Sequence, residues 1–251
     1  MNFTVFAFSY VPDVPTARKN FELDDLTDKE VGKVLFHQRK QRTGQSEDLT
    51  WDQQSLASIS LVHHSMDYVE FESFSLSNCT EAELIHKFFN ALERDGLVVS
   101  WDGNRHQIPL LHFRCMKHGI SHSGYWEAIK SGQEIHFDLS QWLTPTGTHS
   151  HSPLINDIAR RFHYPGMQGH DADTVWNGLL KNDYEAVSGF SDYKALNSYL
   201  IALQIFGLKG DMSYNDSVRA RIKLRDHLEK VAQPSSRYTN FLNAWESENG
   251  S

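Results

Sequence analysis

The N-terminal residues form an apolar run of the kind that predicts a β-strand. The stretch FTVFAFSYVPD, residues 3–13, ends in a Val-Pro-Asp turn. Because successive side chains of a strand point to opposite faces, Ala7 and Ser9 share one face near its end. Two further runs, residues 55–64 and 67–76, read as strands and are separated by a short polar turn. We expect them to form a hairpin that continues the sheet begun by the first strand.

Two helices are predicted on either side of this hairpin. Thr27 with Glu30, and Thr80 with Glu83, have the spacing of a capping box, in which hydroxyl and carboxylate groups satisfy the first backbone amides of a helix. Apolar residues recur at helical intervals after both boxes, and a glycine ends each pattern. The apolar stretch at residues 97–101 then predicts a buried strand. The order strand, helix, hairpin, helix, strand indicates an α/β domain with a mixed sheet.

The second half of the chain has the apolar periodicity of helices. The predicted helices span residues 108–118, 153–162, 173–180, 184–206 and 216–232. The sequence shows no internal repeat and no long linker, so we predict a single domain over residues 1–232. Residues 233–251 are expected to form a C-terminal tail that is frayed after Trp245.

Composition narrows the possible classes of function. Of the 251 residues, 39% are hydrophobic, and no apolar run approaches the ~20 residues needed to cross a bilayer. We therefore expect a cytoplasmic protein with no membrane partner. The net charge of −8 argues against strong non-specific affinity for nucleic acid, which depends on neutralising phosphates, but it permits a local basic groove. Cys79 and Cys115 are far apart in the sequence and form neither a disulfide framework nor a zinc motif.

Five stretches of the sequence together carry a resemblance to a known family. They are FAFSYVPD, SWDGNRHQIPLLHFRCMKHG, EIHFDLSQWL, INDIARRFHYPGMQGHDADTVW and GFSDYKALNSYLIALQ, in the family's order. Over about residues 3–206 the chain resembles the predicted 3′–5′ exonucleases related to the proofreading domain of family B DNA polymerases. The resemblance implies a ribonuclease H-like exonuclease fold, in which helices flank a mixed central sheet. It also implies phosphodiester hydrolysis by two metal ions, which carboxylates hold roughly 3.5–4 Å apart.

The residues that would hold the metal ions are replaced in this chain. The family has an Asp-x-Glu on the first strand, an Asp before a Leu/Ile-Pro pair, and a Tyr-x-x-x-Asp on the last helix, whose tyrosine orients the attacking water. By the resemblance, these positions correspond to Ala7 and Ser9, to Gln107, and to Phe190 and Lys194. Ser9 and Gln107 offer one neutral oxygen each, and Ala7 offers none. Lys194 adds a cation, and two like unit charges ~4 Å apart repel by on the order of 4 kcal/mol at an effective dielectric constant of ~20. The sequence therefore predicts that two-metal hydrolysis is lost.

Three other acids are the candidates for a rearranged site. Asp102 takes the position of an asparagine in the family, Asp138 has the context of a helix N-cap, and Asp13 fits a turn. Asp192 would point about 200° away from Lys194 around the predicted helix. Mg²⁺ or Mn²⁺ would be a cofactor only if a rearranged site existed, with Asp102 helped by Asp138 or Asp13, because a single carboxylate holds such an ion weakly. That arrangement would make the protein a residual 3′–5′ exonuclease.

Fourteen histidines invite a zinc hypothesis, which their spacing does not favour. The nearest pairs, His118 with His122 and His149 with His151, fall in expected loops. A structural zinc ion requires four convergent ligands, and these are usually paired at short spacings. We therefore expect solvated or singly hydrogen-bonded histidines and no metal site.

The resemblance also indicates where a ligand would bind. It places Tyr10 and Arg105 beside the former active cleft and Lys194 within it. An aromatic ring can stack on a base, and the two cations can pair with phosphate. Our leading hypothesis is an exonuclease-like protein that weakly binds the ends of single-stranded DNA or RNA and does not hydrolyse them. The alternatives are a protein-interaction scaffold without nucleic-acid contact and the residual exonuclease.

Overall fold

A five-stranded mixed sheet forms the centre of the computed structural model, which describes residues 1–144, 154–232 and 236–249. The strands are β1 (Phe3–Pro12), β2 (Gln54–His64), β3 (Val69–Ser75), β4 (Val98–Ser100) and β5 (His136–Asp138), in the spatial order β3-β2-β1-β4-β5. β1 pairs antiparallel with β2 and parallel with β4, so the N-terminal strand lies in the middle of the sheet. β2 and β3 form an antiparallel hairpin beside β1, so the predicted hairpin is confirmed.

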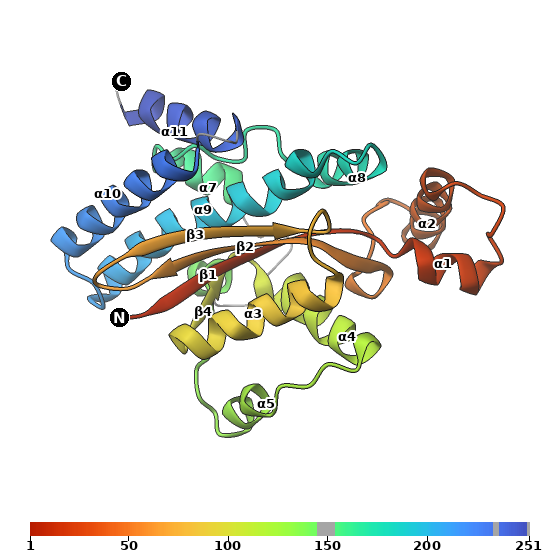
Figure 1. The fold of residues 1–251 in the computed structure, drawn as a ribbon, viewed down its shortest axis with the longest axis horizontal. Helices are drawn as coiled ribbons and strands as arrows, with labels where there is room; N and C mark the ends of the chain where they lie inside the picture. The colour runs from red at the N-terminus through yellow and green to blue at the C-terminus, as the bar shows by residue number, and fades with distance from the viewer. Residues whose placement is uncertain (145–153, 233–235, 250–251) are drawn as a thin grey trace.

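Helices cover both faces of this sheet (Figure 1). The helices that precede β5 in the sequence are α1 (Val14–Phe21), α2 (Asp28–Thr43), α3 (Glu81–Asp95), α4 (Ile108–His118) and α5 (Ser123–Lys130). The helices that follow β5 are α6 (Leu139–Leu143), α7 (Ile155–Arg161), α8 (Ala172–Leu180), α9 (Tyr184–Lys209), α10 (Tyr214–Val231) and α11 (Ser236–Asn249). In Figure 1, α9 and α10 lie along one face and α3 along the other, while α1 and α2 extend beyond the end of the strands. Within the described residues, no helix is long and apolar enough to span a membrane.

The side chains of β1 divide the core between these two layers. Phe3, Val5 and Ala7 belong to the cluster that α9 completes, whereas Phe6 and Phe8 belong to the cluster that α3 and α4 complete. All five are buried, and burying a large apolar side chain stabilises a fold by about 1.5–3 kcal/mol. The sheet with helices on both faces is the ribonuclease H-like arrangement that the resemblance implies, so the expected fold class is confirmed.

The predicted helix starts are confirmed at the two capping boxes. The Glu30 carboxylate accepts a hydrogen bond of 2.8 Å from the backbone N–H of Thr27, at the start of α2. The Glu83 carboxylate accepts one of 2.7 Å from the backbone N–H of Thr80, at the start of α3. Each pair therefore supplies partners to amides that have none inside the helix.

Four segments differ from the sequence predictions, and one of them is β5, where no strand was predicted. Residues 14–21 form α1 where we expected a turn-rich connection, because Asp13 caps the helix by accepting from the backbone N–H of Thr16 at 3.3 Å. Helix α5 was not predicted. Residues 236–249 form α11 where we expected a tail, and α11 buries Phe241 and Trp245 against the core. Residues 145–153, which include both histidines of the second pair, lie outside the described residues.

Candidate functional site

The first-strand positions that the resemblance marks as catalytic lie in a sealed contact between β1 and α9. Ala7 is 1% exposed and Ser9 is 0% exposed. The Ser9 hydroxyl accepts a hydrogen bond of 3.1 Å from the backbone N–H of Ser191. On β2, the hydroxyls of Ser58 and Ser60 lie 2.7 and 2.8 Å from the Ser191 hydroxyl. Small side chains thus fill the space between strand and helix, and the Ser9 oxygen is already used inside the protein.

Gln107 is buried, and its amide has partners on both sides. Its Oε1 accepts a hydrogen bond of 2.9 Å from the backbone N–H of Phe8, and its Nε2 donates to the carbonyl of Trp101 at 3.2 Å. The ladder between β1 and β4 pairs Thr4 and Val5 and has ended before Phe8 is reached. Gln107 therefore satisfies a buried strand amide that the neighbouring strand leaves unpaired. The neutral oxygen that we expected it to offer to a metal ion is not available.

Lys194 is a buried cation at the wall of a cavity. Its side chain belongs to α9 and is 8% exposed, and its Nζ lies 5.8 Å from the ring centroid of Phe190. No carboxylate of the described residues lies within 4.0 Å of this Nζ. Burial lowers the pKa of Lys194 to about 8, and the charges of Asp102 and Asp138 oppose this effect only in part.

The cavity has a volume of about 380 Å³ and brings together residues from distant parts of the chain. It is lined by β1, by helix η2 (Gly103–Gln107), by α2, α8 and α9, and by the segment before β2. Tyr10 and Trp176 give it an aromatic wall, and the Tyr10 ring lies 4.4 Å from the ring of His106. The three residues that we predicted to contact nucleic acid, Tyr10, Arg105 and Lys194, all line this cavity.

Carboxylates outnumber permanent cations around the cavity. The charged residues that line it are Arg105, Lys194, Glu47, Asp48, Asp102 and Asp173. Two of the acids have basic partners: Glu47 lies 2.8 Å from Lys40, and Asp102 lies 3.5 Å from Arg105. Burial lowers the pKa of His106 to about 4, helped by the charges of Lys194 and Arg105, so this histidine is neutral near pH 7. Lys194 is consequently the one buried cation among the described lining residues.

Asp138 is occupied as a helix cap, as the sequence predicted. Its carboxylate accepts hydrogen bonds from the backbone N–H groups of Ser140 and Gln141, at 3.0 and 3.2 Å, and so caps α6. It also accepts from the backbone N–H groups of Asp102 and Asn104, at 3.1 and 2.9 Å. Four amide donors leave little capacity for a cation, and they hold the loop after β4 against β5.

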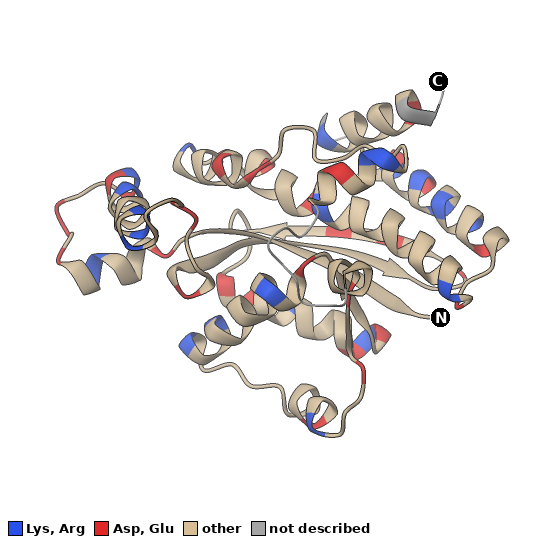
Figure 2. Cartoon of the chain, turned by 180° about the vertical axis from the view of Figure 1, so that it is seen from behind, with Lys and Arg blue, Asp and Glu red and all other residues tan. Residues whose placement is uncertain are grey.

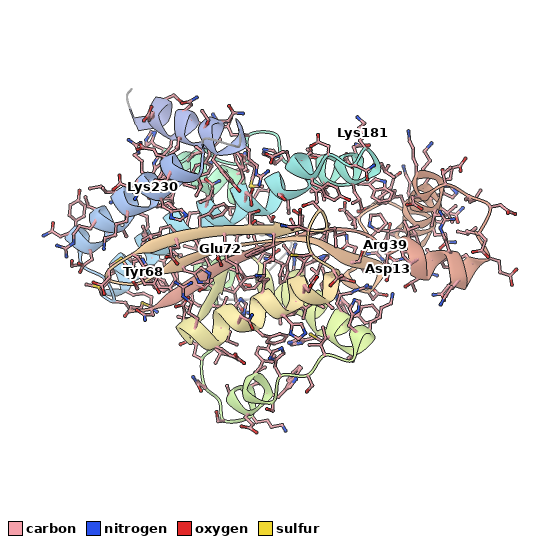
Figure 3. All side chains as sticks on the ribbon, viewed as in Figure 1. Asp13, Arg39, Tyr68, Glu72, Lys181 and Lys230 are labelled. Atoms are coloured by element: carbon pink, nitrogen blue, oxygen red, sulfur yellow. The ribbon has the colours of Figure 1, made fainter. Side chains whose placement is uncertain are left out.

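Asp13 holds an ion-pair network, which corrects its place among the candidate metal ligands. It lies where β1 leads into α1 (Figure 3), is buried, and receives Arg114 at 2.5 Å together with the ammonium of Lys117. Arg114 also pairs with Glu81 at 2.5 Å. Burial would raise the pKa of Asp13, but the hydrogen bonds from Lys117 and Arg114 outweigh it and hold the pKa below its ordinary value. Asp13 therefore joins α1 to α4 and does not line the cavity.

Asp192 turns away from Lys194, as predicted, and forms a buried pair that the sequence analysis missed. Its carboxylate accepts from the hydroxyl of Ser60 at 2.6 Å and from Arg237 at 2.5 Å. Arg237 comes from α11 and also lies 2.5 Å from Glu185. The pair ties the C-terminal helix to α9. The sequence separation of 45 residues gave no signal of it.

These residues do not fit a pair of divalent metal ions. Ala7 has no ligand atom, the oxygens of Ser9 and Gln107 are engaged by backbone amides, and Lys194 is a cation. Across residues 1–144, 154–232 and 236–249, no three His, Cys, Asp or Glu side chains converge so that they could hold an ion. Divalent magnesium in phosphoryl-transfer sites requires at least one or two carboxylate ligands in near-octahedral geometry. No hydrolytic step through metal ions follows from this arrangement.

Comparison with known proteins identifies the family. None of the curated proteins compared with the chain matches it. A family described as predicted 3′–5′ exonucleases related to the exonuclease domain of PolB matches residues 47–245. This range includes Gln107, Phe190 and Lys194, reaches into α11, and begins after β1. The match covers well over half of the chain, and the chain therefore belongs to this exonuclease-related family.

Proposed function

We propose that the chain is a non-hydrolytic member of this family that holds one end of a single-stranded nucleic acid in the cavity beside Lys194. Membership of the family supports a nuclease-related function. The observation that carries the proposal is the buried ammonium of Lys194, which faces a cavity at the position where the family resemblance requires a metal-binding carboxylate. An ammonium there repels metal ions and attracts the phosphate that metal ions would otherwise hold.

The loss of hydrolysis follows from the state of four positions together. Restoring the two-metal mechanism would require carboxylates at Ala7, Ser9, Gln107 and Lys194. Ala7 and Ser9 are buried under α9, and Gln107 accepts a hydrogen bond from the backbone N–H of Phe8 on β1. Asp102 is the one candidate acid that lines the cavity, since Asp138 caps α6 and Asp13 pairs with Arg114. One carboxylate is too few for a two-metal site.

The cavity suits a single nucleotide better than a long strand. Its volume of about 380 Å³ is near the lower end of ordinary ligand sites, roughly 300–1,000 Å³. Tyr10 offers an aromatic face to a terminal base, and Arg105, which is 62% exposed, stands at the rim where a second phosphate could reach it. Figure 2 shows Lys and Arg interspersed with Asp and Glu along the helices. We therefore expect one or two phosphate contacts.

Fluorescence anisotropy with a short, end-labelled single strand tests the proposal. In EDTA and low salt, we expect weak binding whose affinity falls with salt with a logarithmic slope of about −0.7 to −1.4, since each phosphate contact contributes about −0.7 for single strands. Lys194→Met should abolish this binding, and Tyr10→Ala should weaken it by ~1–3 kcal/mol. Lys230→Met, at an exposed position on α10, is the matched control and should bind like wild type. Absence of binding at low salt would overturn the proposal.

A protein-interaction role is the second candidate. It is favoured by the excess of carboxylates around the cavity and by the net charge of −8. In that case the strand would not bind at any salt concentration. A partner would instead protect exposed cavity residues, such as Asp173, from solvent, which hydrogen–deuterium exchange of the neighbouring backbone would detect.

A further inference from the structure

Lys194 has three properties that are rarely found together in a lysine. Its side chain is 8% exposed, its amine faces a cavity of about 380 Å³, and no carboxylate of the described residues lies within 4.0 Å of it. Other lysines of the chain differ in this respect. Lys40 pairs with Glu47 at 2.8 Å, and Lys117 pairs with Asp13. Within the part of the chain that the structure describes, no carboxylate lies at such a distance from Lys194.

The surroundings of Lys194 raise the fraction of its amine that is neutral. Phe190 and Tyr10 supply aromatic rings, and the nearest acids, Asp102 and Asp138, act on it only at longer range. With a pKa of about 8, roughly one amine in ten is neutral at pH 7, compared with about one in 3,000 for an ordinary lysine. A neutral amine has a free lone pair, which is what carbonyl addition requires. The site thus holds a buried nucleophile that opens onto a cavity.

We propose that Lys194 forms a reversible imine with an aldehyde on a ligand held in this cavity. The inference rests on the proposed function and names the ligand class of the same site: a strand end whose terminal sugar has lost its base and has opened to an aldehyde. Such an end carries an aldehyde and a phosphate a few bonds apart. The ammonium form of Lys194 would pair with the phosphate of an intact end. Its neutral form would instead take the aldehyde carbon of an end that has lost its base, and Arg105 at the rim would then take the phosphate.

The reaction needs no further reagent. The Nζ lone pair attacks the carbonyl carbon, a C–N bond forms, and a proton moves from nitrogen to oxygen to give a carbinolamine. The carbinolamine loses its hydroxyl and the remaining nitrogen proton as water, which leaves a C=N bond. The groups around the amine are His106 and Asp102 from the segment after β4, Tyr10 from β1 and Asp138 from β5. His106 is neutral and Tyr10 keeps its proton near pH 7, so neither adds charge beside the amine.

Reductive trapping tests the inference on the full chain. The protein is incubated with sodium cyanoborohydride, which reduces an imine to a stable amine, and with either glycolaldehyde phosphate or a short strand bearing an abasic aldehyde end. Peptide mapping by mass spectrometry should find the adduct on Lys194, formed at least ~10-fold faster at pH 8 than at pH 6, because the neutral fraction rises with pH. Lys194→Arg should lose the adduct. Lys181→Arg should keep it, because Lys181 is exposed and projects from the end of α8 (Figure 3).

The outcomes separate this inference from the proposed function. Labelling spread over surface lysines, with Lys194 unmodified in protein shown by circular dichroism to be folded, would overturn the inference. The wild-type peptide map decides this point even if a variant fails to fold. Binding of an unmodified strand without trapping at Lys194 would overturn the inference and leave the proposed function supported. Trapping of glycolaldehyde phosphate at Lys194 without strand binding would overturn both the proposed function and the strand-end ligand.

Discussion

The hydroxyl of Ser9 on β1 accepts a hydrogen bond of 3.1 Å from the backbone N–H of Ser191 on α9. Both residues are fully buried, and the hydroxyls of β2 pack around them. The strand and the helix therefore meet directly at the place where the family resemblance requires a carboxylate and a bound cation. Protein atoms therefore occupy the position where a metal ion would have to bind.

Ser9→Glu should destabilise the protein and should not restore metal binding. The longer side chain must push α9 away or bury a carboxylate against it, which we expect to lower the free energy of unfolding by ~3 kcal/mol or more. Denaturation with urea measures this difference. The control is Ser121→Glu at an exposed position, which should change the free energy by less than ~0.5 kcal/mol. Wild-type stability together with stabilisation by Mn²⁺ would contradict the sealed contact.

Lys194→Met should stabilise the protein at neutral pH. The pKa of Lys194 is about 8 in the folded chain and 10.5 ordinarily, so the folded state binds fewer protons between these values. The cost of burying the ammonium is thus full below pH 8 and disappears as the pH rises to 10.5. The variant should gain on the order of 3 kcal/mol in the free energy of unfolding at pH 7, and less at pH 10. Denaturation at both pH values, with Lys181→Met as control, checks this. A Lys194→Met protein that is less stable than wild type at pH 7 would refute the claim that burying the Lys194 ammonium is unfavourable.

His63 should make stability depend on pH above neutrality. Its ring nitrogens lie 2.9 Å from Asp95 and 3.2 Å from Glu72, which Figure 3 shows on β3. Burial alone would lower the pKa of His63, but these carboxylates outweigh it and raise the pKa above 6.5. A raised pKa contributes stability below pH 6.5, and this contribution is lost as the pH rises through the folded value.

Below pH 8, where the cost of burying Lys194 is constant, the free energy of unfolding should therefore fall as the pH rises above 6.5, and His63→Gln should remove that part of the slope. Denaturation across this pH range measures the slope. His37→Gln, at an exposed position, should leave the slope as it is in wild type. Equal slopes in wild type and His63→Gln would show that the buried histidine is not charged.

Arg237→Met should be strongly destabilising, because it leaves Asp192 buried without its cation. Removing one partner of a buried ion pair costs ~3–5 kcal/mol. Arg219 also pairs with an aspartate, Asp216, but is 64% exposed, so Arg219→Met should cost less than ~1 kcal/mol. Thermal and chemical denaturation of the two variants compare these costs. Similar small losses in both would mean that the pair between Arg237 and Asp192 does not stabilise the domain.

The sequence predicted those parts of the fold that depend on neighbouring residues. The capping boxes at Thr27 and Thr80 marked the starts of two helices correctly, and the two β-like runs formed the expected hairpin. Helix α1 was missed because its start was read as a turn, although Asp13 as N-cap and a proline in the first turn are also helix-start signals. Helix α11 was missed because the polar end of the chain was read as a tail, although Phe241, Leu242 and Trp245 recur at helical spacing.

The candidate site was predictable in its residues and not in its contacts. The resemblance singled out Ser9, Gln107 and Lys194, but the partner of Gln107 is the amide of Phe8, 99 residues away in the sequence. The partner of Ser9 is 182 residues away. Spacing along the chain carries no information on such contacts. The burial of Lys194 without a carboxylate at ion-pair distance likewise emerges only from the packing of α9 against β1.

Hydrolysis of an end-labelled single strand, in Mn²⁺, in Mg²⁺ and in EDTA, tests the loss of two-metal chemistry most directly. Wild type and Asp102→Ala are compared at equal concentration, since Asp102 is the one candidate acid that lines the cavity. We predict no shortening of the strand above the EDTA control in either protein. Shortening that requires Mn²⁺ and disappears in Asp102→Ala would contradict the loss of hydrolysis.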